Sequence, residues 1–147
     1  MYLKSGIKLH NRFDIEVRDS KTGDLKQKGI AENIVLNQMY SRICADAAYF
    51  VNIHFGNGTG TLDPTRTSLF NHLGTRTAET EETIKAFPVS KWVRKITLNP
   101  EEFVNTTFTE VGIAYGSTNT NLVTQALIKD SEGNPLSLTK TNLDVLV

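Results

Sequence analysis

The chain has 147 residues, and its sixteen basic residues are balanced by sixteen acidic ones, which gives a formal net charge of zero. This length favours a single domain, and the balanced charge argues against recruitment by nucleic acid or anionic lipid. No stretch approaches the roughly 20 apolar residues that a membrane-spanning helix needs. Cys44 is the only cysteine and has small apolar neighbours, so we expect a buried rather than a reactive thiol, in a protein made in a reducing cytosol.

The first predicted element is a β-hairpin within residues 1–35. Phe13, Ile15 and Val17 alternate with charged residues, the period-two pattern of a half-buried strand. A polar turn around Gly23 follows, and the chain then returns as a second strand whose lysines discourage wrong pairing. We expect this hairpin to lie at a sheet edge, where it is available for attachment to a partner.

One helix is expected at about residues 36–48, where apolar residues recur at helical spacing: Leu36, Met39, Ile43 and Ala47. Beyond it, extended runs recur between turn signals, at residues 49–55, 74–85, 90–98, 108–115, 136–138 and 143–147. Residues 122–128 are either a strand or a short helix. The sequence therefore predicts a mainly β fold over residues 1–147, an antiparallel β-sandwich or barrel-like domain with one packed α-helix.

The later strands carry more specific expectations. Residues 108–115 form the most central-looking strand, and residues 90–98 place Trp92, Arg94, Ile96 and Leu98 on one face. In the last run Leu143, Val145 and Val147 alternate with polar residues and predict a half-buried strand. That strand is either tucked into a sheet or a partner, or is the leading part of a longer protein.

A glycine-rich corner follows the apolar run at residues 49–55, with the sequence Gly56-Asn57-Gly58-Thr59-Gly60-Thr61. A phosphate-binding loop of the Walker type needs a lysine and a hydroxyl residue after its last glycine, but Thr61 and Leu62 follow here. A dinucleotide fingerprint needs a third glycine at position 61 and an immediate helix, which Pro64 delays. The corner is therefore interpreted as a tight loop that contacts a neighbouring subunit or partner.

No pattern in the chain predicts catalysis, a metal site or a cofactor. The histidines have no second ligand at metal-binding spacing, and His54, in an apolar strand, is interpreted as a structural histidine. Glu110 is flanked by core-like residues, so its carboxylate must be hydrogen-bonded or paired, and it either ties a turn or faces a partner. A Gly-x-Ser-x-Gly nucleophile elbow is missing from the sequence. Trp92 beside three cations is too little for a nucleic-acid platform.

Several short motifs in a fixed order resemble a module of tailed-bacteriophage virion proteins, especially tail-fibre, baseplate and minor structural proteins. The motifs are Gly58-Thr59-Gly60-Thr61 within the glycine corner, Thr109-Glu110-Val111-Gly112, and Leu138-Thr139-Lys140-Thr141 before the last strand. The resemblance covers residues 30–147. It implies self-assembly and docking onto another virion protein, and it supplies no catalytic residues.

We therefore expect a virion structural protein, made in the host cytoplasm, that is not an enzyme and binds no nucleic acid, membrane or cofactor. Its partners would be copies of itself and other virion proteins of the tail fibre, baseplate or neck, with a host receptor as a further candidate. The alternatives are a capsid decoration or head-fibre protein and a carbohydrate- or receptor-binding module. The expected partner-contact residues are Asn57, Gly58, Thr59, Gly60, Thr61, Asp63, Arg66 and Trp92.

Overall fold

The computed structural model describes residues 8–45, 50–86 and 88–147, and strands dominate these ranges. The strands are β1 Arg12–Asp19, β2 Leu25–Glu32, β3 Ile34–Val35, β4 Asn52–Gly56, β5 His72–Thr77, β6 Thr80–Ala86, β7 Val89–Lys95, β8 Thr106–Phe108, β9 Glu110–Ala114, β10 Thr124–Leu127, β11 Leu138–Lys140 and β12 Asp144–Leu146. The helices are α1 Asn37–Ala45 and the 3-10 helix η2 Asn119–Asn121. The predicted mainly β fold with one α-helix is confirmed.

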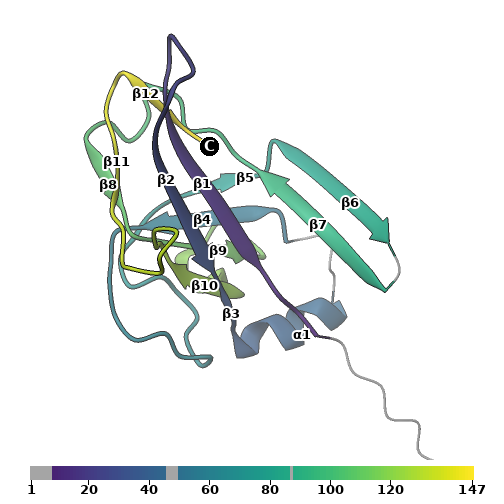
Figure 1. Ribbon diagram of the computed structural model, residues 1–147. Coiled ribbons are helices and arrows are strands. Elements are labelled where there is room, and N and C mark those ends of the chain that lie inside the picture. The colour runs from purple at the N-terminus through teal and green to yellow at the C-terminus, as the bar shows by residue number, and fades with distance from the viewer. Residues whose placement is uncertain (1–7, 46–49, 87) are drawn as a thin grey trace, which may run out of the picture.

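The strands form four antiparallel sheets (Figure 1). Three strands in the order β12-β1-β2 make one sheet, and five in the order β3-β10-β9-β4-β5 make the largest. The pairs β11-β8 and β6-β7 complete the set. The arrangement is sandwich-like, because the three-stranded and five-stranded sheets bury side chains against one another in a shared core.

The core follows from the alternation in the sequence. Ile15 and Val17 on β1 point inward as predicted and meet Phe55 of β4 and Val111 of β9. Phe108 on β8 extends this cluster, with its ring edge-on to that of Phe55 at a centroid distance of 5.6 Å. Burial of such aromatic and branched side chains is the main stabilising contribution to a domain of this size.

The helix α1 begins one residue after the predicted start and closes one end of the five-stranded sheet (Figure 1). Met39 packs with Phe50 and Val123, and Leu36, just before the helix, is fully buried beside Ala114. The predicted last turn, residues 46–48, lies outside the described residues. So does the side chain of Cys44, and the expectation of a buried thiol stays a prediction.

The last strand is where the predicted pattern is wrong. β12 buries Asp144 and Leu146, whereas Leu143 is exposed, so the inward face is opposite to the one expected from Leu143, Val145 and Val147. The reason is that polar contacts to Asp144 outweigh the apolar alternation. Residues 122–128, for which a strand or a helix was open, contain strand β10.

Three further predicted elements differ in detail. Residues 108–115 are divided between β8, which pairs with β11, and β9, which is the central strand of the five-stranded sheet. The first hairpin is at a sheet edge only through β2, because β1 pairs with β12 on its other side. Residues 90–98 leave their sheet after Lys95, so Ile96 and Leu98 are buried, while Trp92 is 46% exposed.

Candidate functional site

The predicted contact residues 57–66 form one loop, called here the glycine loop, which leaves the end of β4. The chain then returns through residues 67–71 to β5. Along this path the backbone is fixed at Pro64, whose carbonyl accepts a hydrogen bond from the Asn37 N–H at the start of α1 (2.8 Å). Leu69, buried to 2% exposure, anchors the return. The loop is therefore attached to the body on the side that returns to β5.

Glu110 lies beneath the glycine loop and holds it. Its side chain is fully buried at the start of β9. One carboxylate oxygen accepts the N–H groups of Gly58 (3.0 Å) and Asn71 (2.8 Å). The other accepts the Phe70 N–H (2.9 Å) and the side-chain amide of Gln125 (3.1 Å). Four donors satisfy the buried carboxylate, so the prediction that Glu110 ties a turn is confirmed.

The glycines are needed because the backbone passes so close to its neighbours. A Cβ at Gly58 would lie 2.4 Å from the Cβ of Phe70 and 2.7 Å from a carboxylate oxygen of Glu110. A Cβ at Gly60 would lie 2.4 Å from the Phe70 ring. At both positions the backbone passes too close to its neighbours for a Cβ atom, so glycine is needed there whatever its backbone angles.

Arg66 supports the loop from within the chain. Its guanidinium lies 3.8 Å over the centre of the Phe70 ring, a cation–π arrangement. Its Nε donates to the side-chain oxygen of Gln125 (3.0 Å), and the side-chain nitrogen of Gln125 donates to Glu110. Arg66 is thus part of the network that fixes the loop, and its guanidinium is already engaged in contacts inside the molecule.

The side chains at the tip of the loop are polar and exposed: Asn57, Thr59, Thr61 and Asp63. The Asp63 carboxylate accepts hydrogen bonds from the hydroxyl (2.6 Å) and the N–H (2.8 Å) of Thr65, and these bonds lower the pKa of Asp63. The Asn57 side-chain oxygen accepts from the Asn71 amide. The exposed tip is therefore a polar surface on a fixed backbone.

Trp92 is not brought to this loop. Its ring lies 6.2 Å from that of Phe50, which precedes β4, whereas the glycine loop follows β4. Five residues of strand separate these positions, roughly 17 Å at about 3.4 Å per residue. The predicted contact residues therefore form two surfaces, at opposite ends of β4.

Two histidines lie near these surfaces, one fully buried and one partly buried. His54 is fully buried, and its Nε2 lies 2.8 Å from the Gly116 carbonyl, which agrees with its interpretation as a structural histidine. The His72 ring stands edge-on at 4.9 Å, and burial lowers the pKa of both histidines. Among the residues that the structure describes, no three His, Cys, Asp or Glu side chains are grouped so that they could hold a metal ion.

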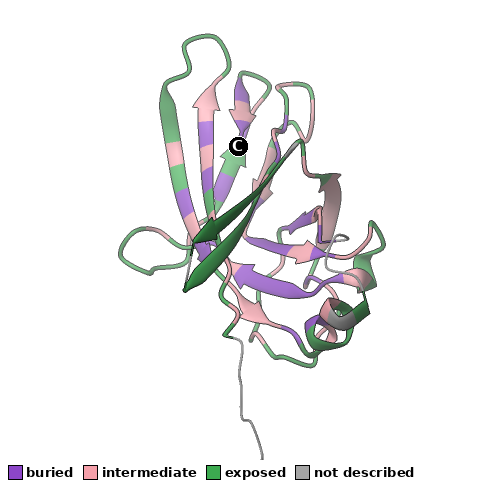
Figure 2. Cartoon of the chain, turned by 90° about the vertical axis from the view of Figure 1, so that its right-hand side faces the viewer, coloured by how far each residue is buried: buried purple, intermediate pink, exposed green. Residues whose placement is uncertain are grey.

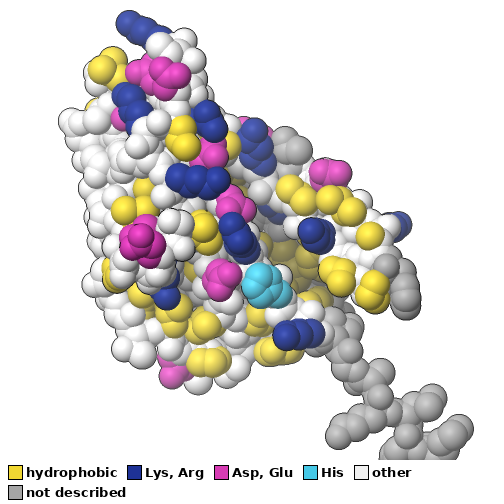
Figure 3. Space-filling view, viewed as in Figure 1, with side chains coloured by type: hydrophobic (Ala, Val, Ile, Leu, Met, Phe, Trp, Pro, Cys, Tyr) yellow, Lys and Arg dark blue, Asp and Glu magenta, His cyan; other side chains and the backbone are white. Residues whose placement is uncertain are grey.

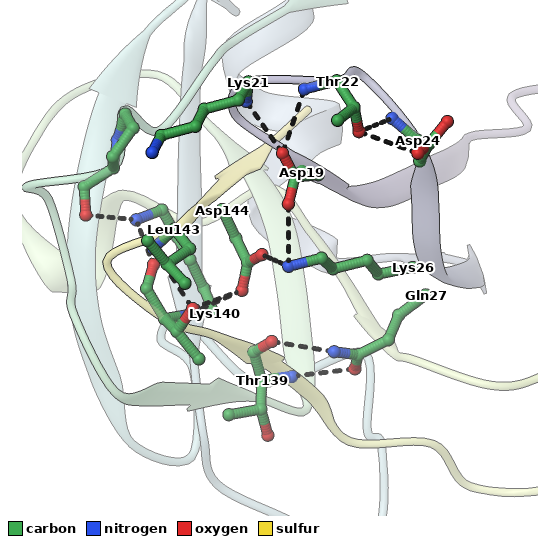
Figure 4. Close-up of polar contacts among 12 residues, drawn as sticks. Asp19, Lys21, Thr22, Asp24, Lys26, Gln27, Thr139, Lys140, Leu143 and Asp144 are labelled. Carbon is green, nitrogen blue, oxygen red and sulfur yellow. Dashed lines mark hydrogen bonds and ion pairs between the residues drawn. The ribbon is translucent and has the colours of Figure 1, made fainter.

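A second polar network, which the sequence reasoning missed, joins β11 and β12 to the first hairpin. Asp144 accepts a hydrogen bond from Lys26 (2.5 Å), and Lys26 also pairs with Asp19 (3.4 Å) (Figure 4). The bond from Lys26 is the main reason why the pKa of Asp144 falls to about 2. Buried Lys140 donates to the carbonyls of Pro100 and Glu102, so it holds the loop that precedes β8.

The only signal for this network was the motif Leu138-Thr139-Lys140-Thr141.

Searches of known protein families, curated protein sequences and solved structures find no significant match to this chain. In the described part of the chain, no helix is long and apolar enough to cross a membrane.

Proposed function

We propose that this chain is a structural protein of a bacteriophage virion, which self-assembles and docks onto other virion proteins in a tail fibre, baseplate or neck. The observation that carries the proposal furthest is the hydrogen bond between Glu110 and Gly58. It joins two of the motifs behind the resemblance, the glycine corner and Thr-Glu-Val-Gly, into one structural unit. The third motif supplies Lys140, which anchors a different loop.

In this proposal the buried polar residues have an anchoring role and none is catalytic. Glu110 and Lys140 both bind backbone groups of loops. A surface that is fixed before its partner arrives loses less conformational entropy on binding. The exposed hydroxyls of Thr59 and Thr61 could then make polar, water-bridged contacts with a partner, which need geometry more than charge.

The location is tested by mass spectrometry and antibody labelling of purified phage particles from the source of the sequence. We expect peptides of the chain in the particles, and label on the tail, baseplate or neck in electron micrographs. Label on the head would favour the capsid decoration or head-fibre alternative. Peptides found only among unassembled proteins of the lysate would contradict a structural role.

The docking surface is tested by T59R in the phage gene, with S131R as a matched control. Both substitutions add a long charged side chain at an exposed loop position, but Ser131 lies in a different turn. We expect T59R to reduce incorporation at least tenfold while its unfolding transition stays unchanged, and S131R to be incorporated normally. Equal incorporation of the two variants would exclude the glycine loop as the docking surface.

A carbohydrate- or receptor-binding module is the second candidate, because Trp92 is 46% exposed and its ring could stack on a sugar. Tyr115 adds little to such a site, since the Arg42 guanidinium lies 3.9 Å over its ring. Trp92 fluorescence titrated with bacterial surface glycans tests this candidate, with W92F as the control for binding elsewhere. Unchanged fluorescence across the glycans would argue against it.

A further inference from the structure

The hairpin of β6 and β7 is set apart from the rest of the fold. Within the described residues these strands pair only with each other, over the full length from Thr80 opposite Lys95 to Ala86 opposite Val89. The hairpin extends from one side of the molecule (Figure 1), and it is exposed along most of its length (Figure 2). A two-stranded hairpin alone is marginally stable in water, and its two outer edges offer unpaired backbone groups.

The two faces of this hairpin differ. Residues directly opposite in the pairing share a face, so Thr83 and Trp92 lie on one face, and the Trp92 ring turns that face toward Phe50 of the body. The other face carries Ile84, Val89 and Val93, which are 39%, 58% and 37% exposed, together with the charged residues Glu82, Lys91 and Lys95. Hydrophobic side chains gather over β6 and β7 in Figure 3. Monomeric proteins rarely leave such a group uncovered without a function.

The two strands also carry opposite charges. β6 contains two glutamates and one lysine, a net charge of −1, whereas β7 contains two lysines and one arginine, a net charge of +3. None of the ion pairs among the described residues involves either strand. These charges therefore have no strong partner inside the described part of the molecule.

We propose that β6 of one copy pairs with β7 of the next, so that the hairpins of several copies close into a ring. The inference rests on the self-assembly part of the proposed function and names its surface and its partner, a second copy of this chain. Pairing of β7 with β7 would place only positive charges opposite one another and is disfavoured, whereas pairing of β6 with β7 brings strands of opposite net charge together. Pairing of unlike strands is a head-to-tail contact, and such contacts generate a ring when the rotation from copy to copy closes.

The geometry of a ring agrees with both faces of the hairpin. Rotation about an axis along the strands keeps every β6 in one direction and every β7 in the other, so each contact between copies is antiparallel. The rest of each copy lies on the face of its hairpin that carries Trp92, outside the ring. The face with Ile84, Val89 and Val93 points to the axis, and Glu82 of one copy can there pair with a lysine, Lys91 or Lys95, of the next. Closure leaves no unpaired edge.

The test is the solution mass, measured by light scattering over a range of concentrations, of the wild-type chain and four variants. E82K changes the net charge of β6 to +1, and K91E/K95E changes that of β7 to −1. The variant E82K/K91E/K95E carries both changes and restores opposite signs. K21E/K129E reverses two exposed lysines elsewhere and controls for net charge.

We expect a wild-type mass of three or more copies, a fall by a factor of three or more in E82K and in K91E/K95E, and recovery in the combined variant. The combined variant should not mix with tagged wild-type chains, because their β7 strands would meet β6 strands of like sign. K21E/K129E should keep the wild-type mass. Circular dichroism and thermal unfolding confirm that each variant is folded.

A wild-type monomer at every concentration would overturn the proposal, as would folded K91E/K95E with the wild-type mass, or failure of the combined variant to recover. The proposed function fails separately. If the chain is monomeric but present in purified particles, only the proposed hairpin contact is contradicted. If it forms a ring but is missing from particles, only the proposed virion role is contradicted.

Discussion

The glycine loop and the β6–β7 hairpin are both exposed, but they are held in place in different ways. The loop has polar side chains outside and a buried carboxylate beneath, whose four hydrogen bonds fix its backbone. The hairpin has apolar side chains outside and pairs with no other strand in the described residues. The conformation of an exposed surface can therefore be fixed either by hydrogen bonds inside its own chain or by contacts with a partner. Substitutions in the loop and in the hairpin should have different effects for this reason.

The largest effect is expected from E110A, which removes the anchor of the glycine loop. The N–H groups of Gly58, Phe70 and Asn71 would lose their acceptor, and buried donors without a partner cost about 1–3 kcal/mol each. We expect a loss of about 4 kcal/mol in the free energy of unfolding in urea. E110Q keeps one oxygen acceptor and should lose less; a loss below about 1 kcal/mol in E110A would mean that the carboxylate is not the anchor.

A smaller loss is expected from G58A, which adds a Cβ where the backbone passes Phe70 and Glu110. Overpacking of a close contact costs about 1–3 kcal/mol, and urea unfolding should show a loss in that range. G133A is the control, since Gly133 has open space around it and its φ of 88° adds only backbone strain. If G58A loses no more free energy of unfolding than G133A, the glycine loop can shift to make room for the added methyl group.

The stability of the β12 network should depend on pH. The pKa of Asp144 is about 2 in the folded chain, against an ordinary value of 3.8 that applies to the unfolded chain. The contribution of this carboxylate to the free energy of unfolding is therefore complete above about pH 4. That contribution is lost as the pH falls from about 4 to about 2, because the unfolded chain takes up the proton first. Urea unfolding at steps across this window should show the loss, and D144N should show a shallower dependence there.

The smallest effect is expected from W92A, because the ring is 46% exposed and lies 6.2 Å from that of Phe50. In the K91E/K95E background, which we expect to be monomeric, the free energy of unfolding should change by about 1 kcal/mol or less. The same substitution in the wild-type background should weaken the oligomer more. A large loss in the monomer would show that the hairpin is part of the core.

The sequence predicted the parts of the fold that depend on apolar alternation. Ile15 and Val17 point inward as expected, and Glu110 is hydrogen-bonded because a carboxylate among core residues has few other options. The helix at residue 37 follows from an apolar stripe with a helical period. These features are local, so the residue pattern contains them.

The missed features depend on partners far along the chain. Asp144 is buried because Lys26 reaches it from β2, and no local pattern records that contact. Lys140 is buried because the carbonyls of Pro100 and Glu102 surround its ammonium group. The separation of β6 and β7 from the body is also invisible to alternation, since a paired strand and a protruding one can carry the same period.

The pairing of β12 with β1 has a consequence for how the protein forms. Val17 lies opposite Leu146, almost the whole length of the chain away, and Leu98 bonds to the same strand end. Contacts between such distant residues slow folding, because a long loop must close before they contribute. During synthesis β1 can pair with β2 as soon as both strands have emerged, but its other edge stays unpaired until the residues of β12 leave the ribosome.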